Sequence, residues 1–280
     1  MAEAIDTFGR ARWSARLDLG FQAVDDKTFI TRRQHLGPLR IQKPFYPADG
    51  ACHVYLLHPP GGYAGQDDLC IEVEAGPGTR ALLTTPAANK AYRSVEDFTS
   101  VKQTLRVDGT LDWLPQGTIL FGGSRVAQHT RIELNRSARM AYWDMVSIGR
   151  PAASDDFVSG VCTQSLEVYL QDHPLWFDRQ EIVGDAEMRS AAWGMNRWTV
   201  MGVLLIFPAD QDLLVAVREA LEPLIGERLA LSVTCVDGML AIRGFADQLE
   251  TLHAGFFALW QLVRPLCHRM PAHRPRIWDT

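Results

Sequence analysis

Apolar and polar residues alternate through most of the first two-thirds of the chain, as they do in β-strands that bury one face. The alternation is clear at 13–19 and again at 69–74. Similar runs follow at 101–107, 126–134, 140–148 and 161–170, and short turns containing Gly, Pro and Asp separate them. The pattern predicts a mainly β body over residues 1–198.

The period changes to that of a helix after Phe207, which ends an apolar, strand-sized run beginning at Val200. Asp210 is placed to cap a helix, and Pro223 is placed to end it. Between them, apolar residues recur at spacings of three and four, at Leu213, Leu214, Val217, Leu221 and Leu224. The spacing predicts an amphipathic helix.

Two further strand-like runs, 229–236 and 239–245, flank Asp237-Gly238, a pair that favours a type I′ hairpin because both residues tolerate positive φ. Asp247 is placed to cap a second helix that ends near Pro265. Residues 199–270 are therefore expected to form strand, helix, hairpin and helix, packed on the β body. Since no repeat or linker divides the sequence, residues 1–280 are expected to form a single structural unit.

Charge and composition narrow the class of partner. The 280 residues carry a formal net charge of -5, which argues against a nucleic-acid surface. No apolar run approaches the roughly 20 residues of a spanning helix, so no membrane contact is expected. The first ten residues lack the apolar segment of a secretory signal, and the 5 cysteines include no C-x-x-C pair. We therefore expect a cytoplasmic protein with reduced thiols.

Catalytic signatures are mostly absent from the sequence, which has no G-x-S-x-G, H-E-x-x-H or P-loop motif. Residues 76–81 match the G-x-G-x-x-[GA] pattern of dinucleotide-binding loops. That pattern works where the loop opens a helix, whereas residues 81–85 have the composition of a strand. A turn between two strands is the better interpretation.

The histidines raise the possibility of a metal site, because imidazole and thiolate suit nickel. Cys52 and His53 are adjacent in a strand and would face opposite sides, and His58 follows shortly after them. A second group, Cys267, His268 and His273, lies near the carboxyl terminus. Ordinary packing is the alternative for both groups, and nickel storage by His268 and His273 is a separate hypothesis.

Two segments have the composition of binding loops. In His58-Pro59-Pro60-Gly61-Gly62 the prolines fix φ and the glycines permit positive φ, so the chain must form a rigid loop. Residues 84–94 gather hydroxyls, an amide, two cations and a phenol, without the carboxylate or histidine of acid–base catalysis. A structural turn and a solvated loop are the alternatives. A β-rich small-molecule binder or hydrolase using the His58–Gly62 loop also stays open.

Five segments are distinctive: RQHLGPLRIQKPFYP at 33–47, CHVYLLHPPGGYAG at 52–65, ALLTTPAANKAYRS at 81–94, LPQGTILF at 114–121 and WDMVSIGRP at 143–151. Together these segments resemble the urease accessory protein D family, also called H. The likeness runs in order from Trp13 to the final RIW at 276–278, and so covers almost the entire chain.

This resemblance implies a non-catalytic chaperone with a β-helix-like winding of strands and two α-helices in its C-terminal third. The implied partners are apo-urease, the all-helical urease accessory protein F and, through that protein, the nickel-carrying GTPase accessory protein G. No permanently bound cofactor is expected. Ni²⁺ would bind only in transit, through an internal channel towards urease.

A channel that releases a dication again needs weakly binding oxygen ligands in its walls. Candidates in the matching motifs are Asp67, Thr84, Thr85, Ser94 and Asp144. A hydrogen-bonded structural carboxylate is the alternative for Asp67 and Asp144. The candidate partner or structural loop comprises Pro59, Pro60, Gly61, Gly62, Tyr92 and Arg93.

The sequence departs from the family pattern at four positions. Gln66 replaces a usual glycine, which changes the backbone angles that the turn can adopt. Asn89 and Ala91 replace a hydroxyl residue and a usually larger one. Gly117 replaces the usual glutamate and so removes a carboxylate.

Overall fold

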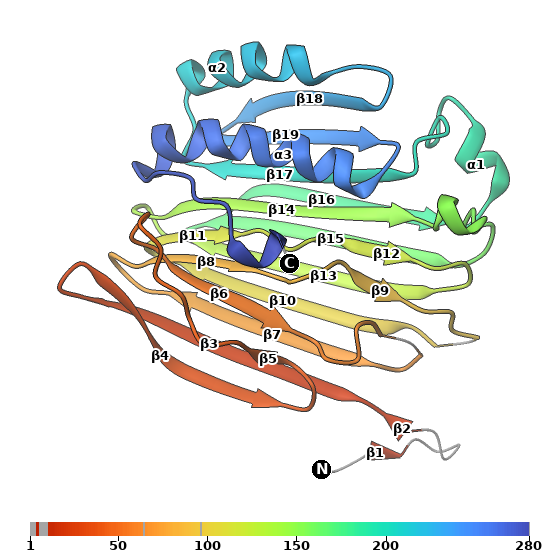
Figure 1. Ribbon diagram of the computed structural model, residues 1–280, viewed down its shortest axis with the longest axis horizontal. Helices are drawn as coiled ribbons and strands as arrows, with labels where there is room; N and C mark the ends of the chain where they lie inside the picture. Colours follow the sequence, from red (N-terminus) through yellow and green to blue (C-terminus); the bar gives the residue numbers. More distant parts are fainter. Residues whose placement is uncertain (1–3, 6–10, 64, 96, 280) are drawn as a thin grey trace.

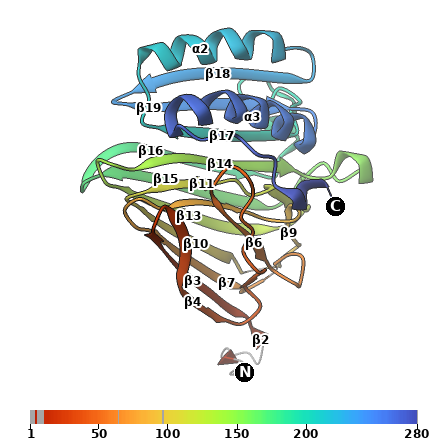
Figure 2. The ribbon, with the colours of Figure 1, turned by 60° about the vertical axis from the view of Figure 1, so that its left-hand side comes forward.

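The computed structural model describes residues 4–5, 11–63, 65–95 and 97–279, with the backbone alone described at 4–5 and 11–12. Two β-sheets and one layer of helices make up most of this structure (Figures 1 and 2). A short ribbon of β1 (Ala4–Ile5) and β2 (Ala11–Arg12) lies apart from them at the amino end. Within the described residues, every helix is too short or too polar to cross a membrane.

The first sheet has seven strands in the order β16-β15-β13-β10-β7-β3-β4. The strands from β15 to β3 run parallel, and the edge strands β16 and β4 are antiparallel to their neighbours. Their bounds are β3 Ser14–Val24, β4 Lys27–Leu36, β7 Asp68–Ala75, β10 Thr99–Val107, β13 Arg125–Leu134, β15 Val161–Leu170 and β16 His173–Val183.

The second sheet has ten strands, with β18-β19-β17-β14-β11-β8-β6-β5 in order and β12 and β9 attached beside β14. Its strands β14, β11, β8 and β6 are parallel, whereas β17, β19 and β18 are antiparallel. The bounds are β5 Arg40–Ile41, β6 Cys52–Leu57, β8 Arg80–Thr84, β9 Asn89–Ala91, β11 Thr110–Trp113, β12 Thr118–Leu120, β14 Arg139–Ile148, β17 Val200–Phe207, β18 Leu229–Val236 and β19 Met239–Ala246.

The chain winds between the two sheets. It passes from β7 to β8, from β10 to β11 and from β13 to β14 through short turns, and returns to the first sheet each time through a longer segment. Successive circuits therefore stack in parallel. The mainly β fold expected from the alternation and the β-helix-like winding implied by the resemblance are both confirmed.

The order strand, helix, hairpin and helix after residue 199 is also confirmed: β17, α2 (Gln211–Leu221), β18–β19 and α3 (Leu249–Val263). Asp210 caps α2 by accepting a hydrogen bond from the backbone N of Leu213 at 2.8 Å. Asp237 has φ 48 and Gly238 φ 80, as a type I′ turn requires.

The predicted cap of α3 was wrong by one residue. Gln248 is the N-cap and makes no side-chain cap hydrogen bond, while Asp247 accepts from the hydroxyl of Thr251 and from Arg228. A short helix, α1 (Ala186–Ser190), lies in the segment expected to be β. The remaining helical turns are Pro151–Ala153, Glu222–Leu224, Arg264–His268 and Arg276–Asp279.

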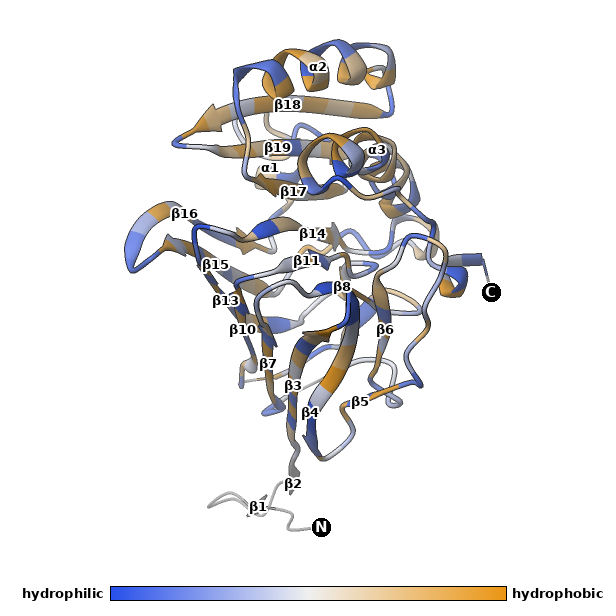
Figure 3. Ribbon diagram, turned by 90° about the vertical axis from the view of Figure 1, so that its left-hand side faces the viewer, coloured by the Kyte–Doolittle hydropathy of each residue, from blue (hydrophilic) through white to orange (hydrophobic). Residues whose placement is uncertain are grey.

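The core has two layers, which fix what each face of the second sheet contacts. One layer, with Leu17, Val73 and Leu105, fills the space between the sheets, and the other, with Leu204, Phe256 and Trp260, lies between the second sheet and helices α2 and α3. Figure 3 shows the elements around these layers, with the helices above and the first sheet descending from β16 to β3. Alternate residues of β11 and β14 therefore enter different layers.

Candidate functional site

Two chambers lie between the sheets and meet at one carboxylate. The larger has a volume of ≈ 200 Å³ and the smaller ≈ 60 Å³, and Gln128 and Asp144 line both. A volume of this size holds several water molecules or a partly hydrated ion. Asp144 and the side chains on either side of it therefore form the candidate site.

Asp144 comes from β14, at a position that faces the first sheet. Its Oδ2 accepts hydrogen bonds from Nε2 of Gln128 at 2.5 Å and from Nε2 of Gln164 at 3.0 Å. Burial raises the pKa of Asp144 to about 6, although these amides and the backbone N–H of Met145 favour the charged form. The side chain is only half-buried by its accessible surface, because the chambers adjoin it. At neutral pH it is a mostly ionised carboxylate held by neutral donors.

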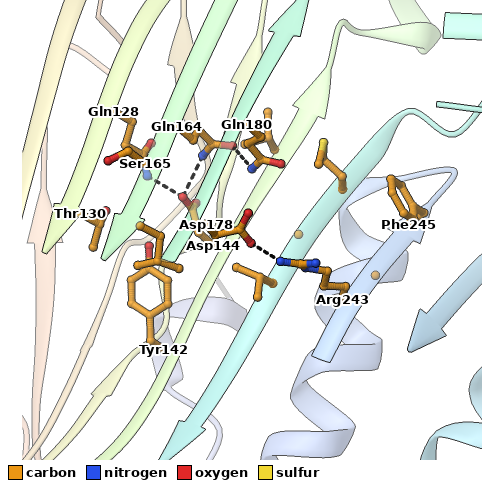
Figure 4. Close-up of a pocket in the computed structure, with 16 residues that line it drawn as sticks. Gln128, Thr130, Tyr142, Asp144, Gln164, Ser165, Asp178, Gln180, Arg243 and Phe245 are labelled. Atoms are coloured by element: carbon orange, nitrogen blue, oxygen red, sulfur yellow. Dashed lines mark hydrogen bonds and ion pairs between the residues drawn. The ribbon is translucent and has the colours of Figure 1, made fainter. Parts of the chain in front are cut away.

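A polar row continues from Asp144 through the smaller chamber, as Figure 4 shows. Gln180 donates to Oε1 of Gln164 at 2.7 Å. Beyond it, Nη2 of Arg243 lies 2.6 Å from Oδ2 of Asp178, and the two side chains are 51% and 24% exposed. This ion pair joins β16 of the first sheet to β19 of the second at the outer side of the chamber.

The larger chamber is lined mostly by apolar side chains such as Leu56, Ile71 and Trp113. Its polar lining includes His58, Thr85, Asn89 and Gln103. Two buried atoms of this lining, Nδ1 of His58 and Oε1 of Gln103, have no hydrogen-bond partner among the described residues. Burial lowers the pKa of His58, so its imidazole is neutral at physiological pH.

The two loop motifs of the sequence meet beside this chamber. Tyr63 donates through its backbone N to the carbonyl of Lys90 at 2.8 Å, and Tyr92 donates back to the carbonyl of Tyr63 at 2.9 Å. A Cβ on Gly62 would lie 2.4 Å from the Lys90 carbonyl oxygen and 2.6 Å from the Tyr92 ring, so this approach requires glycine. Pro59, Pro60, Gly61, Tyr92 and Arg93 are exposed around the contact.

The structure distributes the candidate channel residues among different surroundings. Asp144 and Thr85 line the larger chamber. Thr84 faces the helices: its hydroxyl donates to the carbonyl of Leu114 at 2.5 Å and accepts from Nε1 of Trp278 at 2.8 Å. Ser94 donates to the carbonyl of Asp97 at 2.7 Å, and Asp67 precedes β7. Among these described residues, Asp67, Thr84 and Ser94 line neither chamber.

The four departures have local structural settings. Gly117 lines the larger chamber with φ +91, and a Cβ there would meet the Met145 carbonyl oxygen at 2.8 Å, so this backbone excludes a glutamate. At the turn, the left-handed residue is Gly65, whereas Gln66 donates to Oδ2 of Asp97 at 2.9 Å. Asn89 also lines the chamber, and Ala91 is 1% exposed.

The remaining histidine candidates enter other contacts. His53 lies 2.9 Å from Asp49, and His268 lies 3.2 Å from Asp112, in a fully buried group of charges that contains Arg264. His273 is exposed. Within the described part of the chain, no cluster of three or more His, Cys, Asp or Glu side chains could hold a metal. Among the described residues, His268 and His273 are not gathered into a site for nickel storage.

Sequence reasoning missed the amides around Asp144. Gln128 and Gln164 occupy inward positions of β13 and β15, in the same alternation as Val126 and Leu166. Strand alternation predicts that both positions are buried, and a polar residue at a buried position could have indicated a hydrogen-bonded site. Their partner could not be identified from that signal, because Asp144 lies on the opposite sheet.

The fold and the site define a mainly β protein wound around an interior cavity, with one carboxylate where its two chambers meet. A family model described as UreD urease accessory protein matches residues 14–279. The chain belongs to the UreD urease accessory protein family. The resemblance seen in the sequence is thereby confirmed.

Individual relatives match along almost their full length. The urease accessory protein UreD of Alkalilimnicola ehrlichii is 39% identical, over 96% of this chain and 92% of the relative. That of Klebsiella aerogenes is 38% identical, over 96% and 97%. The urease accessory protein UreD 2 of Brucella anthropi is 37% identical, over 96% and 98%.

Proposed function

We propose that this protein assists urease maturation as a non-catalytic scaffold that binds apo-urease and passes Ni²⁺ between its two sheets. The observation that carries the proposal is Asp144, a carboxylate with neutral hydrogen-bond donors at the junction of two chambers. Family membership supplies the client, since the relatives are named urease accessory proteins.

The lining fits a cargo that must leave again. A resident dication is held by several converging ligands at once, whereas here one carboxylate is surrounded by amide and hydroxyl groups. Such neutral oxygens bind a dication weakly, and a single carboxylate between them provides a favourable intermediate position. The cargo would exchange its water stepwise for Asp144, the glutamines and, in the larger chamber, Thr85.

The partners follow from the same proposal. The exposed loop around Pro59, Pro60, Tyr92 and Arg93 lies next to the larger chamber and is a candidate contact for accessory protein F, which would recruit the GTPase accessory protein G. Nucleotide hydrolysis would then belong to a partner, in keeping with the lack of a P-loop motif in the sequence.

A urease activation assay tests this function. In a strain that lacks the protein, the wild type should restore urease activity, and Asp144→Asn should not, although it still co-purifies with apo-urease. The matched control is Thr84→Val, on the other face of the same sheet, which should restore activity. Failure of the wild type to restore activity, or full restoration by Asp144→Asn, would contradict the proposal.

A second candidate is a small-molecule binder that uses the larger chamber. It is favoured by the mostly apolar lining beside the His58–Gly62 loop and by the raised pKa of Asp144. However, ≈ 200 Å³ lies below the roughly 300–1,000 Å³ of typical ligand pockets. Specific retention of a small metabolite by the purified protein, lost in Asp144→Asn, would support this alternative.

A further inference from the structure

Among the polar side chains that line the larger chamber, one is an imidazole and most of the others could bind a metal only through oxygen. The chamber's polar oxygens belong to Asp144, Gln128, Gln103, Asn89, Thr85, Thr118 and Tyr63. Among the described residues that line the two chambers, His58 is the side chain with a nitrogen lone pair to offer, because Lys90 and Arg243 are cations and the amide and indole nitrogens are donors only. The described lining of the larger chamber therefore has one side-chain nitrogen that could bind a metal.

One nitrogen of the His58 imidazole lacks a hydrogen-bond partner among the described residues. Nδ1 of His58 is buried, and no described residue makes a hydrogen bond to it. Gln103, from β10 on the opposite sheet, lines the same chamber, and its buried Oε1 also has no hydrogen-bond partner among the described residues. Burial lowers the pKa of His58 and keeps the ring neutral. An orphaned buried polar atom costs free energy, so two of them at one cavity call for an explanation.

Oxygen donors alone would not distinguish Ni²⁺ from Mg²⁺. Carboxylate, carbonyl and hydroxyl oxygens are the ligands that Mg²⁺ prefers, whereas an imidazole nitrogen favours nickel. A path lined only with oxygen would admit the more abundant ion as readily as the cargo. Discrimination therefore needs a nitrogen or sulfur ligand, and His58 is placed to supply it.

We propose that His58, with Gln103 lining the same chamber, forms a selectivity site whose imidazole binds the incoming transition-metal ion before it reaches Asp144. The proposal rests on the proposed nickel-transfer function and deepens it. His58 lies at the end of β6, directly before the Pro-Pro turn closed by the backbone hydrogen bond from Gly61 to the His58 carbonyl at 2.8 Å. That rigid turn holds the ring in position.

Direct metal binding to the full-length protein tests the site. Ni²⁺ is titrated into the wild type and into His58→Gln, in the absence and in the presence of excess Mg²⁺. Since loss of even an outer-sphere partner weakens metal sites by about 10–100-fold, we expect His58→Gln to bind Ni²⁺ at least about tenfold more weakly. Binding of Mg²⁺ should be unchanged, so the preference for nickel falls by the same factor.

The chain provides a matched control in His253. It is half-buried, its buried Nε2 lacks a partner among the described residues, and burial lowers its pKa to about 4. Its ring, however, packs against Trp143 and Trp278 on the helix side of the sheet, with centroids 5.4 Å and 4.7 Å away. His253→Gln should leave both metal affinities unchanged.

Two further measurements separate a ligand from a structural residue. X-ray absorption of the bound nickel should show imidazole scattering in the wild type and in His253→Gln but not in His58→Gln. His58→Cys, which substitutes another donor suited to nickel, should retain more of the preference than His58→Gln, a result that packing alone does not explain.

The proposal is overturned if His58→Gln keeps the wild-type preference for nickel or its imidazole scattering. It is also overturned if the folded wild type binds Ni²⁺ no better than Mg²⁺. Neither result touches the urease activation assay, in which loss of function by Asp144→Asn would still support the transfer path. Conversely, failure of the wild type in that assay would remove the proposed function and leave the binding measurement to decide whether His58 is a nickel ligand.

Discussion

Asp112 and Asp144 lie on neighbouring strands of one sheet and face opposite sides of it, in two different electrostatic environments. Asp112, on β11, enters the layer beneath the helices and is 0% exposed. Oδ2 of Asp112 accepts from Nε of Arg264 at 2.8 Å, and Oδ1 accepts from Nε1 of Trp260 at 3.3 Å. Although burial opposes ionisation, Arg264 and His268 lower its pKa below the ordinary value.

Asp144, on β14, enters the layer between the sheets and receives only neutral donors. Among the described residues that hydrogen bond to it, none carries a positive charge. Asp112 is therefore part of a buried ion pair on one face of the sheet, whereas Asp144 on the other face is a carboxylate without a charged partner among the described residues that hydrogen bond to it. The difference shows that Asp112 has a cation from its own chain, whereas Asp144 has none among the described residues that hydrogen bond to it.

The largest effect is expected from removing the internal cation. Arg264 is 0% exposed and also donates to Oδ2 of Asp49 at 2.7 Å, so Arg264→Gln removes the guanidinium that two buried carboxylates share. Breaking a buried pair in this way costs about 3–5 kcal/mol. Urea denaturation should show this loss of unfolding free energy.

The control for this variant is Arg243→Gln, because Arg243 is 51% exposed and pairs with Asp178 at the surface. Exposed pairs are worth about 0–1 kcal/mol, so its midpoint should move little. Equal losses in the two variants would show that the Arg264 group is no more important to stability than a surface pair.

Replacement of Asp144 is expected to increase the free energy of unfolding, whereas replacement of Arg264 decreases it. The folded pKa of Asp144, about 6, lies above the ordinary 3.8, so the native state binds the proton more tightly than the unfolded chain does. Ionisation therefore costs stability above pH 6, and the cost disappears as the pH falls below 4. Asp144→Asn should stabilise the protein by roughly 1–2 kcal/mol at pH 8, which is less than the full effect of two pKa units because the residue is only half-buried.

Denaturation of Asp144→Asn and the wild type from pH 8 to pH 4 measures this difference. Both amide hydrogen bonds reach the same oxygen, Oδ2, so an asparagine can keep them. The gain should shrink steadily on acidification. A gain that does not depend on pH would mean that Asp144 is not strained by its charge.

A smaller effect is expected at Thr84, which shares the helix side of the sheet with Asp112. Thr84→Val leaves the carbonyl of Leu114 and Nε1 of Trp278 without a partner, at a cost of about 1–2 kcal/mol. Thermal unfolding should detect it, while urease activation stays intact. On the helix side of the sheet, Thr84→Val should lose stability but keep function. On the side between the sheets, Asp144→Asn should gain stability but lose function. Loss of activation by Thr84→Val would undo that division.

Much of the fold could be predicted because its signals are local. Alternation identified the strands of the β body, and Asp210 and Asp237-Gly238 were correctly assigned to a helix cap and a hairpin turn. The cap of α3 was misplaced because Asp247 and Gln248 are adjacent candidates, and Asp247 is instead held by Arg228 and Thr251. Helix α1 has only 5 residues, too few for a periodic signal.

The candidate site was less predictable. Asp144 and Thr85 were identified from motifs, and the structure brings both to the larger chamber. Thr84 and Thr85 are neighbours with the same side chain, and only their burial in different layers separates them. Gln128 and Gln164 come from the other sheet, so their meeting with Asp144 depends on how the two sheets pack.

The sequence by itself determined that this chain is a mainly β member of its family, because strand alternation, turn chemistry and motif order are written in short stretches. Only the tertiary structure decided which carboxylate acquires a counter-ion. Alternation tells that successive side chains face opposite sides, but not what covers each side. Arg264 reaches Asp112 across 152 residues of sequence, and the same packing leaves Asp144 between two sheets with neutral neighbours.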